Sequence, residues 1–307
     1  MEGKYEIWAN CSHESSWRSF LAGIPCVSIV YPFKKFFMKK MSFVRIFLLL
    51  FCGMFCMAGE LCAQKVQPYM PVSQLPDLIK CLPAPPAFDS PEFANDVVRY
   101  QWGKQQRLNP ERAAIAQRDA VWTFEALFAE FSEPFGLQIS QLGTPEIWKL
   151  LKTSIVTADQ MRVAPKAYYH RLRPFEMYGE HLLSPDKEDE VRGEGSYPSG
   201  HTMRGWVTAL LLAEIAPERA DTIFARGWMY GESRVIEGAH WQSDVDVSRA
   251  AASIAYAALQ TSSAFREQME AAKAEYARLT AVSGKNKYTA EVPAANECSQ
   301  KTIIKTK

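Results

Sequence analysis

Residues 195–216, GSYPSGHTMRGWVTALLLAEIA, place small and polar residues directly before an apolar segment. The segment 202–216 is mainly apolar around a whole helix, which is typical of a helix buried in a protein core. Its most apolar part, 207–213, is flanked by charged residues and is much shorter than the about 20 residues that span a membrane. His201 stands at the start of this core helix. A histidine there is most often a cap or a packed residue, so its role depends on which other residues the fold brings to it.

The remainder of the chain also shows the apolar spacing of helices. Residues 89–92, DSPE, indicate a helix start, with a capping side chain, a proline in the first turn and an acid. Alternating strand patterns are nearly absent, and the sequence shows no internal repeat. We predict an all-α fold with a single helical bundle-like domain over residues 89–282. The further expected helices are 93–107, 112–131, 147–162, 218–235, 244–260 and 264–279.

The N-terminal part of the chain indicates export. Residues 38–63 contain basic residues, then an apolar run and then small residues, which is the order found in a secretory signal peptide. The apolar run is short for a membrane span, and a retained anchor is the alternative. Residues 1–37 are interpreted as an extension from an upstream translation start, with a true cytosolic extension as the alternative. We expect a Pro-rich segment at 64–88, no stable membrane insertion after signal removal, and a polar tail at 283–307.

Composition sets limits on the function. Of the 307 residues, 48% are hydrophobic and 22% are charged, which is an ordinary globular composition. The net charge of +1 argues against a broad nucleic-acid-binding surface. Only two of the seven cysteines, Cys81 and Cys298, follow the predicted signal peptide. In an exported protein this pair is interpreted either as a disulfide that ties the ends of the domain together or as two free thiols.

A first cluster of positive charge lies in residues 166–174, KAYYHRLRP. Lys166 and Arg173 are seven residues apart, which is two helical turns, so we expect both on one helix face, with Pro174 ending the helix. Two converging cations repel one another and therefore call for an anion between them. Arginine offers a planar fork that fits a phosphate edge, and lysine adds a point charge. Taken alone, these residues would be an ordinary solvated helix face.

A second anion-binding feature is the start of the core helix. A helix N-terminus presents free backbone amides and the positive end of the helix dipole. The amides of Ser199, Gly200 and His201 are expected at that end, and Gly200 lets the backbone come close to a ligand. The Ser199 hydroxyl can add one hydrogen bond. The stretch therefore predicts an anion site.

A third block, residues 233–244 with the sequence SRVIEGAHWQSD, supplies another histidine. Asp244 follows His240 by four residues, so a helix would place both side chains on one face. A carboxylate on one imidazole nitrogen fixes the tautomer and leaves the other nitrogen's lone pair free to attack. A turn at Gly238 would bring Arg234 to the same pocket. Because no third histidine or cysteine cluster surrounds these residues, we predict no metal site, and we predict phosphoryl transfer by a histidine nucleophile.

These three blocks resemble the signature of the type-2 phosphatidic acid phosphatase superfamily. The blocks are Lys166 with Arg173 and Pro174, then Pro198-Ser199-Gly200-His201, then Ser233-Arg234 with His240 and Asp244. Within the superfamily, GSYPSGHT at 195–202 resembles the class A bacterial non-specific acid phosphatases. The stretches LPAPPAFDSPEFANDVVRYQWGKQQR and GESRVIEGAHWQSDVDVSR extend the likeness over most of residues 82–260.

The resemblance implies a role for each residue. His240 would attack phosphorus and carry a phosphohistidine, Asp244 would orient it, and His201 would protonate the leaving alcohol and then activate water. It implies no cofactor. It further implies an all-α protein, a homodimer or larger homo-oligomer, periplasmic or secreted, acting on small-molecule phosphomonoesters at acidic pH. The phosphoryl oxygens would be held by Lys166, Arg173, Ser199, Gly200 and Arg234.

Four functions fit the motifs to different degrees. The first is an exported acid phosphatase that can also pass phosphate to alcohols. A vanadium-dependent haloperoxidase uses the same residue pattern, because a phosphate pocket also fits vanadate. A membrane lipid phosphatase should show several transmembrane helices around the motifs, and a simple phosphate-binding protein would not require two histidines and Asp244. The class A likeness and the modest length favour the acid phosphatase.

Overall fold

The computed structural model describes residues 66–283, and within that range it contains helices and no strands. The predicted all-α fold is confirmed. No helix within the described range is both long and apolar enough to cross a membrane. The predicted signal peptide, the extension before it and Cys298 lie outside the described residues. The α-helices are α2 (Leu78–Cys81), α3 (Pro91–Gln106), α4 (Pro110–Ala120), α5 (Phe124–Phe135), α6 (Pro145–Asp159), α7 (Val163–Tyr169), α8 (Pro174–Tyr178), α9 (Gly200–Ile215), α10 (Ala220–Glu237), α11 (Gln242–Leu259) and α12 (Ser263–Ser283).

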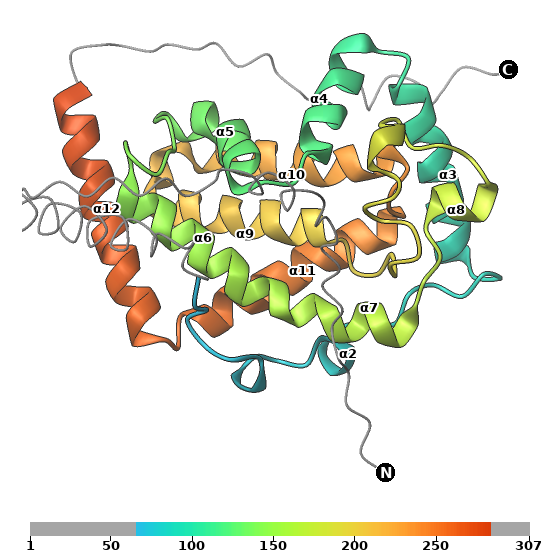
Figure 1. Cartoon of the computed structure of the whole chain (residues 1–307), viewed down its shortest axis with the longest axis horizontal. Helices are drawn as coiled ribbons and strands as arrows, with labels where there is room; N and C mark the ends of the chain where they lie inside the picture. The colour runs from blue at the N-terminus through green and yellow to red at the C-terminus, as the bar shows by residue number, and fades with distance from the viewer. Residues whose placement is uncertain (1–65, 284–307) are drawn as a thin grey trace, which may run out of the picture. The chain divides into compact units, whose positions relative to one another are not determined.

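Helix α9 lies in the middle of this bundle, with α6, α10 and α11 beside it (Figure 1). Most of its side chains are buried, and Val207, Leu211 and Leu212 have no exposed surface, while Trp206, Leu210 and Glu214 on one face are partly buried. The prediction of a core helix is therefore confirmed. The helix begins at Gly200, slightly earlier than expected, because the Ser199 hydroxyl caps it by accepting a hydrogen bond of 3.3 Å from the amide of Thr202.

The start of α9 packs very closely against the second half of α10. A Cβ atom on Gly205 would lie 2.5 Å from Cδ1 of Tyr230, and one on Gly231 would lie 3.1 Å from Cγ2 of Thr202. Only glycine allows two helices to approach this closely without displacing a side chain. The crossing consequently brings the residues that follow Ser199 next to the turn of α10 that carries Arg234.

The single helix expected over 112–131 is wrong, because the chain breaks there into α4 and α5. Val121 leaves the helical conformation with ψ 120°, and the Thr123 hydroxyl starts α5 by accepting a hydrogen bond of 3.0 Å from the amide of Ala126. A threonine cap in the middle of an apolar helical pattern was the overlooked signal. The break matters for the site, since it leaves the last carbonyl groups of α4 facing the start of α9.

The Pro-rich segment before α3 is irregular, as expected, apart from the 3-10 turn Val72–Gln74 and the short helix α2. It nevertheless contributes Met70, Leu75 and Leu78 to the hydrophobic core. The amide of Tyr69 also donates a hydrogen bond of 2.9 Å to the Thr157 hydroxyl of α6. The segment is thus part of the folded unit rather than a loose leader.

Candidate active site

The expected helix carrying both Lys166 and Arg173 is wrong. Helix α7 ends at Tyr169, because His170 adopts a left-handed conformation with φ 45°. Pro174 then begins α8 instead of ending a helix, a position where its missing amide hydrogen costs nothing. The two cations therefore come from separate elements, joined by a turn that the seven-residue spacing did not reveal.

Lys166 and Arg173 converge all the same, through contacts with the loop before α9. Lys166 Nζ donates a short hydrogen bond to the Gly195 carbonyl, and Arg173 Nε donates one of 3.0 Å to the Glu194 carbonyl. Both cations are buried, with 6% and 1% of their surface exposed. A Cβ atom at position 195 would overlap the Lys166 carbonyl oxygen, so glycine is required for this close approach.

His240 lies in the turn between α10 and α11. Gly238 ends α10 in a left-handed conformation with φ 85°, and the amides of Ala239 and His240 both donate to the Arg234 carbonyl. The expected turn at Gly238 is therefore present. The imidazole is buried, and its Nε2 lies 3.1 Å from Nη1 of Arg173.

Asp244 lies in the first turn of α11, whereas His240 lies before that helix. The two residues therefore do not share one helix face, which is where the four-residue spacing placed them. Oδ2 of Asp244 lies 3.5 Å from Nδ1 of His240 and accepts a hydrogen bond of 2.8 Å from the Trp241 amide. The Ser196 hydroxyl donates a short hydrogen bond to the same oxygen. The carboxylate thus faces one ring nitrogen of His240 while Arg173 faces the other.

Arg171, which no sequence pattern pointed to, holds Asp244 in place. Arg171 is buried and spans two carboxylates, with 2.5 Å from Nη1 to Asp244 Oδ1 and 2.7 Å from Nη2 to Asp96 Oδ2. Asp96 belongs to α3, and it also accepts hydrogen bonds from the amide and hydroxyl of Ser243. A lone arginine whose partners lie more than 70 residues away leaves no local pattern to detect.

The start of α9 carries Ser199, Gly200 and His201 as expected, with one difference. The Ser199 amide is not free for an anion, because it donates a hydrogen bond of 2.7 Å to the Ser248 hydroxyl. The hydroxyl of Ser199 is fully buried and caps the helix. A Cβ on Gly200 would press against the Arg162 side chain, with 3.1 Å to its Cδ.

His201 keeps part of its surface exposed, although protein atoms surround most of the ring. Its Nε2 lies 3.3 Å from the Ala120 carbonyl at the end of α4. The ring is stacked near Tyr230 and meets the edge of Trp122. These contacts leave Nδ1 as the nitrogen that is available to a ligand.

Arg234 is the strongest indication of a bound anion. The residue is 2% exposed, yet its Nε and Nη1 atoms have no hydrogen-bond partner within the described part of the chain. A buried guanidinium without partners is costly unless a ligand supplies the missing acceptors. The neighbouring Ser233, by contrast, is structural: it accepts from Arg112 and donates to Asp119.

Comparison with known proteins agrees with this geometry. Residues 147–267 match the model of the PAP2 superfamily. The non-specific acid phosphatase of Providencia stuartii is 43% identical over 212 residues, which cover 69% of this chain and 85% of that protein. The chain belongs to the PAP2 superfamily. A non-specific acid phosphatase of Salmonella typhimurium is 38% identical with the same coverage, and an acid phosphatase of Zymomonas mobilis is 33% identical over 65% of this chain and 75% of its own length.

The predicted family is therefore confirmed, and the motif residues of this PAP2 chain meet in one place. Burial lowers the pKa of Lys166 to about 7, with a further lowering by the charge of Arg173. Burial likewise lowers the pKa of Arg173 to about 10. The protein thus places positive charge where solvent cannot stabilise it, and an anion would favour the charged form of both groups.

Both histidines of the PAP2 site are held in the neutral form when no ligand is bound. Burial places the pKa of His240 well below its usual range, and the charges of Arg173, Lys166 and Arg234 lower it further. Burial, Arg234 and Arg204 do the same to the pKa of His201. Neutral imidazole is the form that has a lone pair for attack on phosphorus.

The remaining histidines of the described range lie outside this cluster. His170 ends α7, and the exposed His181 pairs with Glu188 at 3.0 Å. No group of three or more histidine, cysteine or acidic residues within residues 66–283 is arranged to hold a metal ion.

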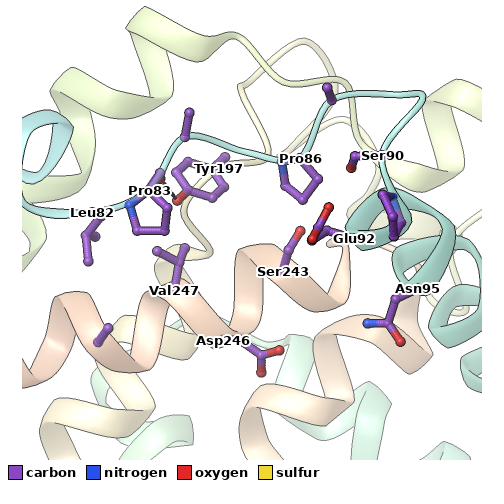
Figure 2. A pocket seen from close by; sticks show the side chains of 14 residues that line it. Leu82, Pro83, Pro86, Ser90, Glu92, Asn95, Tyr197, Ser243, Asp246 and Val247 are labelled. Carbon is purple, nitrogen blue, oxygen red and sulfur yellow. Dashed lines mark hydrogen bonds between the residues drawn. The ribbon is translucent and has the colours of Figure 1, made fainter.

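A separate groove lies beside the PAP2 site, between the chain before α3 and helix α11. Figure 2 shows its mainly apolar walls, with Pro83 and Pro86 on one side and Val247 on the other. Tyr197 contributes to the wall, and its hydroxyl donates a hydrogen bond to the Pro83 carbonyl. The groove is lined by none of the predicted phosphate-binding residues, so it is not the reaction centre.

Proposed function

We propose that this protein, an acid phosphatase by family, hydrolyses phosphate monoesters through a phosphohistidine on Nε2 of His240. The observation that carries the proposal is the buried cluster of Lys166, Arg173 and Arg234, in which Nε and Nη1 of Arg234 lack acceptors within residues 66–283 and Arg173 contacts Nε2 of His240. The phosphoryl oxygens of a substrate would provide those acceptors. Positioned cations of this kind stabilise the charge that develops during phosphoryl transfer.

In the first step, the lone pair of His240 Nε2 attacks phosphorus and the bond from phosphorus to the ester oxygen breaks. The leaving oxygen takes a proton from Nδ1 of His201 and departs as an alcohol. The Nδ1 proton of His240 stays beside Asp244, whose carboxylate stabilises the positive ring. The oxygens of the phosphoryl group are held by Lys166, Arg173, Arg234, the Ser199 hydroxyl and the amide of Gly200.

His201 must carry a proton to act as the acid, and substrate binding explains how the ring becomes protonated. In the empty site, the positive charge of Arg234 helps to lower the pKa of His201. A phosphate dianion beside Arg234 cancels that repulsion and raises the pKa again. The Ala120 carbonyl accepts from Nε2 of His201 and so keeps the transferable proton on Nδ1.

In the second step, water attacks the phosphohistidine. His201 Nδ1 removes a proton from the water as the bond between phosphorus and Nε2 breaks, and orthophosphate is released. An alcohol that takes the place of water accepts the phosphoryl group by the same chemistry. We therefore propose phosphotransfer to alcohols as a second reaction of this site.

We further propose that the protein is exported, with residues 38–63 removed, and acts as a homodimer or larger homo-oligomer in the periplasm or outside the cell. The order of basic, apolar and small residues supports export. Cys81 is exposed at the end of α2, and Cys298 lies outside the described residues, so a disulfide between them stays one of the two interpretations of the pair. The intact mass of exported protein, with and without reductant, tests the cleavage and the disulfide together.

The test of the proposed function is hydrolysis of p-nitrophenyl phosphate by the purified protein in the presence of EDTA, with and without vanadate. Activity that resists EDTA, is inhibited by vanadate and is lost in His240→Ala supports the proposal. Near-wild-type activity in His240→Ala would overturn it. Oxidation of halide by peroxide after vanadate is added, without phosphatase activity, would instead identify the haloperoxidase, which the relatives do not favour.

A further inference from the structure

A carboxylate already lies at the cations that are proposed to hold phosphate. The oxygens of Glu194 lie 3.4 Å from Nη2 of Arg173, 3.8 Å from Nζ of Lys166 and 3.0 Å from Nη1 of Arg162. The Glu194 side chain is 45% exposed, whereas the Lys166 and Arg173 side chains are 6% and 1% exposed. It therefore covers buried positive charge from the solvent side.

The contacts of Glu194 separate into a backbone part and a side-chain part. The backbone carbonyls of Glu194 and Gly195 accept from Arg173 Nε and Lys166 Nζ, and these bonds hold the cations in place. Among the residues that the structure describes, the carboxylate receives hydrogen bonds only from the guanidinium groups of Arg162 and Arg173. Its removal would leave the backbone contacts of both buried cations intact.

Arg162 has a carboxylate partner besides Glu194, namely Asp159, which it shares with Arg204. Its Nε and Nη2 bind both oxygens of Asp159 at 2.8 and 3.1 Å. Lys166 and Arg173, in contrast, have Glu194 as the carboxylate within 4 Å of their charged nitrogens in the described range. The resident charge of Glu194 thus compensates the same two cations that a phosphoryl group would engage.

We infer that Glu194 is an internal competitor for phosphate, which must leave the cation cluster when a phosphomonoester binds and which returns as orthophosphate departs. This inference rests on the proposed function, because it takes the cluster to be the phosphoryl site. Its half-exposed side chain can turn into solvent without breaking any backbone hydrogen bond. Glu194 accordingly determines how tightly substrate and product phosphate are held.

The experiment compares orthophosphate binding by wild type and Glu194→Gln, both as full-length protein, by competitive inhibition of p-nitrophenyl phosphate hydrolysis and by titration calorimetry. Glu194→Gln removes the charge that competes with phosphate, so orthophosphate should bind more tightly. Because half-exposed ion pairs are individually weak, the gain should be modest: we expect the inhibition constant of orthophosphate to fall by about 3- to 10-fold, and KM to fall with it. Glu194→Ala should change both constants in the same direction. Glu190→Gln is the matched control, because Glu190 pairs with Lys187 in the same loop.

The outcomes separate this inference from the proposed function. An orthophosphate inhibition constant that stays unchanged or rises in both Glu194 variants, in an active enzyme, would overturn the inference and leave the phosphatase intact. A fall in kcat with weaker phosphate binding would show that the carboxylate only positions the cations, which also overturns it. A wild type that neither hydrolyses the ester nor binds orthophosphate would remove the proposed function and the inference together.

Discussion

Nη1 of Arg173 lies 3.1 Å from Nε2 of His240, and this contact assigns the protons of the imidazole. A guanidinium only donates hydrogen bonds, so Nε2 must be the accepting nitrogen and must carry the lone pair. The ring proton then resides on Nδ1, which faces Asp244 Oδ2 at 3.5 Å. The folded protein therefore presents His240, the proposed nucleophile, in the reactive tautomer, beside the cations that are proposed to bind the phosphoryl group.

Replacing Asp244 by asparagine should remove this arrangement. The amide cannot stabilise a positive imidazole, so kcat should fall by about 10³- to 10⁴-fold, as for a comparable carboxylate in a catalytic triad. Steady-state kinetics with p-nitrophenyl phosphate measure the change. Asp246→Asn, an exposed acid on the same helix, is the control and should keep its activity. Equal activities for the two variants would contradict the proposed stabilisation of a positive His240 ring by Asp244.

Arg171 should be a stability residue of the site. Its removal in Arg171→Met leaves two buried carboxylates, Asp96 and Asp244, without their shared partner. Breaking a buried ion pair in this way costs about 3–5 kcal/mol in the free energy of unfolding. Urea unfolding of Arg171→Met measures it, beside Arg192→Met, whose half-exposed pair with Glu188 should be worth less than about 1 kcal/mol. Similar losses in the free energy of unfolding in both variants would contradict the stabilising role of the buried ion pairs of Arg171.

Anion affinity should depend on pH through Lys166. Its pKa in the empty site is about 7, so the ammonium is charged below that pH and neutral above it. A bound anion favours the charged form of Lys166, so the affinity for the anion should be highest at acidic pH and should decrease as the pH rises through about 7. Sulfate remains a dianion throughout this pH range, so it does not titrate itself and is the suitable competitive inhibitor for measuring the change.

Lys166→Arg separates this effect from other titrations. Arginine keeps its charge over the same range, so the rise in the sulfate inhibition constant with pH should be smaller in the variant. An identical pH profile in both proteins would mean that another group is responsible.

The close crossing of α9 and α10 should be intolerant of one added methyl group. In Gly205→Ala the new Cβ would meet the Tyr230 ring at 2.5 Å, and moving two packed helices apart costs about 1–3 kcal/mol of stability. The shift would also separate His201 from Arg234, so kcat/KM should fall. Gly143→Ala is the control, since its Cβ would meet only the rotatable Ser140 hydroxyl. A Gly205→Ala variant as stable and active as wild type would contradict the described crossing.

The parts of the site that could be predicted are those with a local pattern. The start of the core helix close to Ser199 and the turn at Gly238 were both predicted, because each arises within a few residues. The convergence of Lys166 and Arg173 was predicted from the wrong element. Their spacing fits two helical turns, but the left-handed His170 ends the helix between them.

The parts that could not be predicted depend on distant partners. The role of Arg171 depends on the fold, which brings Asp96 of α3 within hydrogen-bonding distance of it. Glu194 appears in the sequence as one more acid in a charged loop, and only the structure places it on buried cations. Electrostatic contacts of this kind depend on tertiary distance and burial, which leave no periodic trace in a sequence.

The most direct test of the central claim is to locate the phosphoryl group during turnover. In His201→Ala, His240 should still attack the phosphorus of p-nitrophenyl phosphate, because p-nitrophenolate departs without an acid. The variant should activate water poorly, so the phosphoenzyme should accumulate. Rapid quenching of this variant followed by peptide mass spectrometry should find an acid-labile phosphoryl group on His240. A burst of p-nitrophenol with no phosphoryl group on His240, or with the group on another residue, would contradict the account.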